Sequence, residues 1–160
     1  MNRNLPFFDY NKCFEHYAER IANIRQARIQ GEIIVAKPVF LLAIIDEMDE
    51  DIFVDNCFVI NYWLEERYDA LMRHYTKGSQ FNKAAGIEKP FWHLESDGFW
   101  HLNYPGERLS KERTQSKAWL KEHVHFAYFD EALWVLLENQ EWRTKLRNFI
   151  VEHKLQAAEK

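Results

Sequence analysis

A run of seven apolar residues, Val39–Ile45, is hydrophobic on every side and must be enclosed by the rest of the chain. The run is far shorter than the roughly 20 residues of a membrane-spanning helix, so it predicts a buried helix. Pro38 suits the first turn of that helix, and residues 33–36 before it are expected to be extended. We therefore place a helix beginning at Pro38 at the centre of the core.

Apolar periodicity predicts several other helices around this one. The first covers residues 9–30 and stops at Gly31, and another covers residues 62–75 with Asn61 as its cap. A short strand is expected at residues 56–60. The C-terminal part of the chain is expected to form helices at about 114–126, 130–138 with Asp130 as cap, and about 140–155.

The segment Pro90–Leu102 has the most distinctive sequence in the chain. Two aromatic runs flank Glu95-Ser96-Asp97-Gly98, a turn signal in which glycine supplies a positive φ. We predict a β-hairpin here, with Trp100 buried beneath it.

The predicted elements occur in the order helix, short strand, helix and hairpin, which is the plan of a winged helix. The predicted fold class is therefore α+β and predominantly helical, with a winged-helix-like core, one β-hairpin wing and C-terminal helices. No linker or internal repeat divides the sequence, so a single domain is expected over residues 1–160.

Charge is distributed unevenly along the sequence. The formal net charge is −4, which excludes nucleic-acid binding by bulk attraction. Acidic residues gather at 46–55 and 130–141, whereas segments 20–37, 73–93 and 107–121 each carry an excess of three positive charges. Two interpretations stay open, one cationic face or an ordinary mixed surface.

The sequence gives no sign of metal-dependent or catalytic chemistry. His93 and His101 could approach each other across the predicted hairpin, but a zinc site needs three or four ligands and neither cysteine is placed to help. There is no nucleophile elbow, no Gly-rich phosphate loop and no ββα-metal unit of an HNH nuclease. We therefore expect no metal, no cofactor and no enzyme activity.

The expected location is the cytoplasm, without a membrane partner. Residues 1–10 contain one basic residue and no apolar run, so they do not form a signal peptide. The two cysteines form no CxxC pair, which is typical of ordinary thiols in a reducing compartment.

Several motifs of the sequence follow a family pattern. They are Lys37-Pro38 with Leu41-Leu42-Ala43, Pro90-Phe91, Asp97-Gly98-Phe99-Trp100, Ser116-Lys117-Ala118-Trp119-Leu120, and Phe129-Asp130 with Leu133, Leu136 and Leu137. With these motifs, residues 10–155 resemble the sulfur-binding domain of HNH-type, phosphorothioate-dependent restriction endonucleases. The resemblance implies a winged-helix-like domain that reads DNA in which sulfur replaces a non-bridging phosphate oxygen.

The resemblance also implies a site, a shallow apolar cup edged by cations. The family motif places Lys37, Pro90, Phe91 and His93 at this cup, and the basic segments add Arg28, Lys83 and Lys89 as expected DNA contacts. The sequence departs from the family pattern at two positions. Lys89 stands where tyrosine is often found, and Ala36 stands where histidine or an aromatic residue is common.

Two functions remain under consideration. The first is a stand-alone module of a restriction or defence system that binds double-stranded DNA, with or without phosphorothioate, and leaves cleavage to a separate nuclease subunit. The alternative is a protein-interaction or scaffold domain that kept the fold and lost its DNA surface. The net charge, the acidic run at 46–55 and the missing aromatic residue at position 89 favour the alternative.

Overall fold

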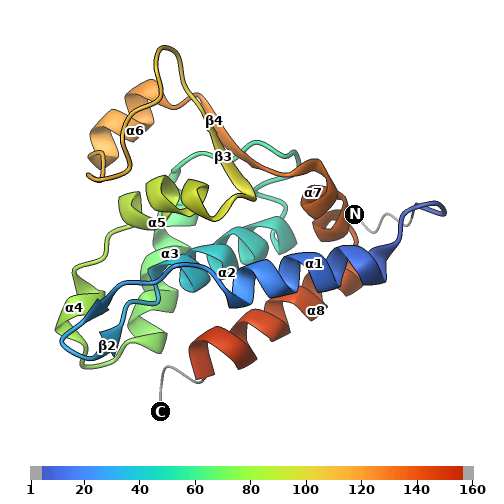
Figure 1. Ribbon diagram of the computed structural model, residues 1–160, viewed down its shortest axis with the longest axis horizontal. Helices are drawn as coiled ribbons and strands as arrows, with labels where there is room; N and C mark the ends of the chain where they lie inside the picture. Colours follow the sequence, from blue (N-terminus) through green and yellow to red (C-terminus); the bar gives the residue numbers. More distant parts are fainter. Residues whose placement is uncertain (1–4, 157–160) are drawn as a thin grey trace.

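Helix α2 (Ala36–Asp49) lies in the middle of the molecule in the computed structural model, which describes residues 5–156 (Figure 1). It packs against α3 (Tyr62–Tyr75), α5 (Glu88–His93) and α8 (Gln140–Ile150). Every residue of Val39–Ile45 is buried. The central helix predicted from the apolar run is therefore confirmed, with its first residue two positions earlier than expected.

The other elements surround α2 and are mainly helical, so the predicted α+β, predominantly helical class is confirmed. They are α1 (Tyr10–Ala22), β1 (Arg28–Ile29), β2 (Glu32–Ile33), α4 (Gln80–Lys83), a 3₁₀ turn (Leu94–Asp97), β3 (Trp100–Asn103), α6 (Lys117–His123), β4 (Phe126–Phe129), α7 (Glu131–Glu138) and a π-helical turn (Val151–Leu155). No helix in the described part of the chain is long and apolar enough to cross a membrane.

The first helix is shorter than the predicted 9–30. It ends at Ala22, and the chain then forms the antiparallel hairpin β1–β2, in which Ile29 pairs with Glu32. The two residues of its turn, Gln30 and Gly31, both have positive φ, as a tight two-residue hairpin turn requires. Gly31 therefore serves this turn and does not end the helix.

The predicted cap and bounds of α3 are confirmed, but the strand predicted just before this helix is not. The Asn61 side chain accepts a hydrogen bond from the Leu64 amide, at 2.9 Å, and the helix covers the predicted residues 62–75. The predicted strand at 56–60 is wrong in extent, because only Phe58 pairs, through a single bridge to Ala127.

The β-hairpin predicted at 90–102 is wrong, and the wing that it supplied is absent there. Pro90 instead lies in the first turns of α5, where its fixed φ is compatible with a helix, and the 3₁₀ turn follows. Gly98 has the expected positive φ, +93°, but it ends that turn. Only the second aromatic run becomes a strand, β3.

Strand β3 pairs with β4, which begins at the last residue of the predicted helix 114–126 and continues into the stretch before the next predicted helix. The register runs from Trp100 opposite Phe129 to Asn103 opposite Phe126. Buried and half-buried side chains alternate along β4, which is the period of a strand. Trp100 is fully buried as expected, among the rings of Phe40, Phe58, Phe91 and Phe129.

Candidate nucleic-acid interface

A cavity of about 640 Å³ lies where the start of α2 faces α5, and we call it the Pro90 cavity. Four further segments complete its wall: the stretch between α1 and α2, the stretch between α4 and α5, the 3₁₀ turn, and the loop 104–116. The lining residues are Arg25, Gln26, Ala27, Ile34, Ala36, Lys37, Ala85, Lys89, Pro90, His93, Ser96, Lys111 and Thr114.

Four of the seven residues predicted at the site line this cavity: Lys37, Lys89, Pro90 and His93. The other three lie elsewhere. Phe91 is buried in the core against Phe40 and Trp100, so it supports α5 from behind. Arg28 lies on β1 and donates a hydrogen bond to the Gly31 carbonyl, at 3.2 Å. Lys83 lines a second cavity next to this one.

The lining combines apolar surface with positive charge. Its apolar part consists of Ile34, the small side chains of Ala27, Ala36 and Ala85, and the ring of Pro90. Its cations are Arg25, Lys37, Lys89 and Lys111, and no carboxylate is among the lining residues. Such a surface suits a polarisable, weakly hydrated atom that belongs to an anion.

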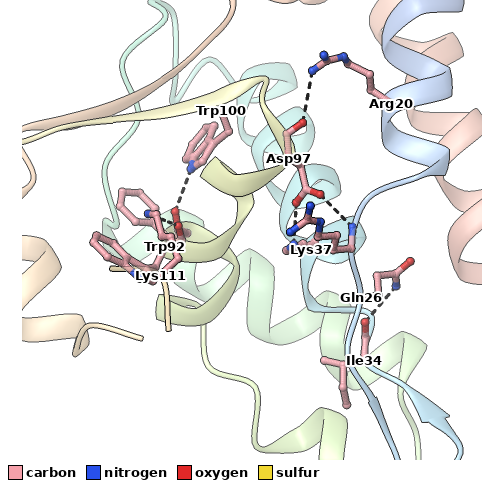
Figure 2. Close-up of polar contacts among 10 residues, drawn as sticks. Arg20, Gln26, Ile34, Lys37, Trp92, Asp97, Trp100 and Lys111 are labelled. Atoms are coloured by element: carbon pink, nitrogen blue, oxygen red, sulfur yellow. Dashed lines mark hydrogen bonds and ion pairs between the residues drawn. The ribbon is translucent and has the colours of Figure 1, made fainter. Parts of the chain in front are cut away.

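Lys37 is held in place by a carboxylate beneath the cavity wall. Its Nζ lies 2.7 Å from Oδ2 of Asp97 at the end of the 3₁₀ turn (Figure 2). The other oxygen of Asp97 accepts a hydrogen bond from the Arg25 amide, at 2.9 Å. One carboxylate therefore fixes two of the cationic positions, and it also offsets part of the Lys37 charge.

The 3₁₀ turn is in close contact with α1 at Gly98. The Arg20 guanidinium donates to the Asp97 carbonyl, at 3.4 Å (Figure 2). A β-carbon on Gly98 would lie 2.7 Å from the same guanidinium. Glycine at this position thus satisfies both the positive φ and the close approach of Arg20.

The side chain of His93 is oriented by the loop 104–116, and its surroundings favour the neutral form of the imidazole. Its Nε2 is 2.7 Å from the Thr114 hydroxyl. Burial lowers the pKa of His93 below its usual 6.5, and the charges of Lys37, Lys111 and Lys89 lower this pKa further. An anion in the cavity would offset the charges of these lysines and so raise the pKa of His93.

Lys111 fastens the loop 104–116 to α5. Its ammonium lies over the Trp92 ring, 3.4 Å from the centroid, and donates to the Trp92 carbonyl at 2.8 Å (Figure 2). It also pairs with Glu95, at 2.8 Å. Burial is the main cause that lowers the pKa of Lys111, and the pair with Glu95 opposes this effect.

Several lining residues were not among the predicted site residues, notably Arg25, Lys111 and Thr114. Arg25 and Lys111 belong to the basic segments 20–37 and 107–121, but only the tertiary fold brings them to Pro90. His93 and His101 do not meet, because His101 contacts Asp130 instead. Within residues 5–156, no three His, Cys, Asp or Glu side chains gather as metal ligands would.

Comparison with known proteins identifies the family and the fold of this chain. A family described as "ScoMcrA-like, DNA sulfur-binding domain" matches residues 59–160, more than half of the chain. Among solved structures, the chain resembles the "Sulfur binding domain of SprMcrA complexed with phosphorothioated DNA", with a TM-score of 0.65 and 18% identity. The match covers 91% of this chain and 87% of that one, which shows a shared fold. No curated protein matches. From the family match, this chain belongs to the ScoMcrA-like DNA sulfur-binding domains.

Proposed function

We propose that this protein binds double-stranded DNA at the Pro90 cavity and recognises a phosphorothioate there. The observation that carries the proposal is the lining of the cavity, in which apolar residues lie beside four cations and no carboxylate is present. The solved structure of similar fold is complexed with phosphorothioated DNA, which supports the same choice of ligand.

Phosphorothioate differs from phosphate mainly at one atom. Sulfur is larger than oxygen and less strongly hydrated, while the group keeps its negative charge. Contact with Pro90, Ala36 and Ala85 removes the sulfur from water at little desolvation cost, whereas a phosphate oxygen in the same place loses hydrogen bonds to water. The surrounding cations attract both groups equally and supply affinity without regard to base sequence.

Lys89 contributes to this cavity in two ways. It is exposed at the second position of α5, next to Pro90, and no carboxylate in the described chain lies within 4.0 Å of its ammonium. We assign its aliphatic stem to the apolar wall and its ammonium to a neighbouring phosphate.

We further propose that residues 1–160 act as one DNA-binding domain without nuclease activity, and that a separate nuclease subunit performs any cleavage. The family that matches is a binding domain, which supports this division of labour. Incubation of purified protein with phosphorothioated plasmid and Mg²⁺ or Mn²⁺ tests it, and linear or nicked product would contradict it.

A paired titration tests the binding proposal. Two duplexes of identical sequence, one with a single phosphorothioate and one without, are titrated by fluorescence polarisation at several salt concentrations. We expect tighter binding to the phosphorothioate duplex at every salt concentration. Absence of binding to both at low salt would contradict the proposal and favour a protein-interaction domain.

The variant Lys89→Tyr, measured in the same titration, tests the role assigned to Lys89. The aromatic ring extends the apolar wall by a few tens of Å², so preference for phosphorothioate should rise by about 1 kcal/mol while one cationic contact is lost. An equal loss of affinity for both duplexes would make Lys89 a simple phosphate contact.

A further inference from the structure

A second cavity of about 490 Å³ lies beside the first, between the C-terminal half of α3 and α4. Three of its lining residues are cations: Arg73, Lys77 and Lys83. All three are exposed, and the turn that carries Lys77 and Gly78 leaves the cavity open to solvent. The second cavity thus offers positive charge to a ligand from outside.

None of these three cations forms an ion pair within the described chain. Eight lysines and arginines elsewhere lie within 4.0 Å of a carboxylate, namely Lys37, Arg67, Lys111, Lys117, Lys121, Arg143, Lys145 and Arg147. In the described chain, no carboxylate lies that close to Arg73, Lys77 or Lys83. Their charges therefore remain available for a bound anion.

The two cavities are neighbours with one lining residue in common. Ala85 lines both of them. Asn82 in α4 lines the second cavity and bonds to the segment before α2: its amide donates to the Ile33 carbonyl at 3.0 Å, and its oxygen accepts from the Val35 amide at 2.8 Å. A DNA strand that reached from one cavity to the other would therefore pass near Ala85.

One carboxylate, Asp69, lies in the lining of the second cavity. Burial is the main cause that raises the pKa of Asp69, and neighbouring Glu65 raises it further, while Lys117 and Arg73 oppose the shift. Asp69 leaves the three cations in excess, and it should repel an anion that enters.

We propose that the second cavity binds an unmodified phosphate of the same DNA strand that places its phosphorothioate in the Pro90 cavity. The inference rests on the proposed function and adds a second DNA contact, one that does not distinguish sulfur from oxygen. The Pro90 cavity discriminates sulfur from oxygen, while Arg73, Lys77 and Lys83 hold the backbone without discrimination and fix the direction of the strand.

Removal of two charges tests this division. The variant Arg73→Gln/Lys77→Gln should bind phosphorothioate and plain duplexes more weakly by the same factor. The slope of log affinity against log salt should fall by about 0.9, which is the contribution of the one phosphate contact that is lost. Lys145→Gln is the matched control, because Lys145 is also exposed but lies outside both cavities and already pairs with Glu141, so its slope should stay at the wild-type value.

The variant Asp69→Asn provides a second test, in which affinity for DNA is expected to rise. A misfolded variant would lose affinity, so poor folding cannot produce this result. Removal of the like charge should raise affinity for both duplexes equally. Unchanged affinity and slope in the charge variant, or a loss confined to the phosphorothioate duplex, would overturn the second cavity while leaving the proposed function intact. If the wild-type protein binds neither duplex, the proposed function itself fails.

Discussion

The ammonium of Lys37 lies 2.7 Å from the carboxylate of Asp97, sixty positions later in the chain, and only 5% of the Asp97 side chain is exposed. This pair joins the first turn of α2 to the 3₁₀ turn after α5. A lysine predicted as a free DNA contact is therefore also part of the framework of the Pro90 cavity.

Lys37→Met should destabilise the fold, because it leaves the Asp97 carboxylate buried without its cation. Loss of one partner of a buried pair costs about 3 kcal/mol or more. The double variant Lys37→Met/Asp97→Asn removes both charges and should recover much of the loss. Urea denaturation of both variants measures this, and a single variant as stable as wild type would refute it.

His93 should make both stability and DNA affinity depend on pH. Its pKa is lowered in the folded protein, so its contribution to stability is complete above the ordinary value of 6.5 and is lost as pH falls toward the folded pKa. A bound anion favours the charged imidazole, so affinity for phosphorothioate DNA should rise as pH falls through the same range.

His93→Gln is the comparison for this pH dependence. Glutamine keeps a polar group near Thr114 but does not titrate. Polarisation titrations between pH 5.5 and 8, on the order of one unit either side of the ordinary histidine pKa, should show a flatter profile in the variant. Parallel profiles would exclude His93 as the titrating group.

Trp100 should be essential for folding. Its ring is fully buried and its indole N–H donates to the Phe91 carbonyl, at 2.9 Å, on the helix that carries Pro90. Trp100→Ala should cost roughly 3–5 kcal/mol. Trp100→Phe keeps an aromatic ring, so thermal denaturation should show a smaller loss; equal losses would contradict the role assigned to the ring.

Lys111 should control the mobility of the loop 104–116. Lys111→Met removes the pair with Glu95 and the bond to the Trp92 carbonyl, so the loop loses its main polar anchor. Limited trypsin digestion should cut faster at Arg108 and Arg113, and preference for phosphorothioate should fall because the loop forms one cavity wall. Lys121→Met, at an exposed lysine outside the cavity, should digest like wild type.

Helices were predictable where the signal is local. The apolar run of α2 and the Asn61 cap of α3 both act within a few residues, and both predictions are confirmed. The pairing of β3 with β4 was not predictable from local signals, because the loop 104–116 and α6 separate the two strands in the sequence. Nothing in the aromatic segment 90–102 distinguishes pairing with its own first half from pairing with Phe126–Phe129.

The Pro90 cavity shows the same limit. Motif resemblance led to Lys37, Pro90 and His93, which do line the cavity, but it also included Phe91, whose ring faces the core. Arg25 and Lys111 each lie in a segment with several other basic residues, so the sequence does not distinguish them as site residues. Their placement depends on Asp97, which accepts a hydrogen bond from the Arg25 amide, and on Glu95, which pairs with Lys111. Both acids take these positions only after α5 and the 3₁₀ turn have formed.

Helix α2 also separates charge along its length. Its C-terminal acids Asp46, Glu47 and Asp49 are matched by Arg147, Arg67 and Arg143, while its N-terminal turn opens on the Pro90 cavity. The two ends lie about 20 Å apart. In a protein with a net charge of −4, this arrangement should favour approach to a duplex through the face that carries the Pro90 cavity.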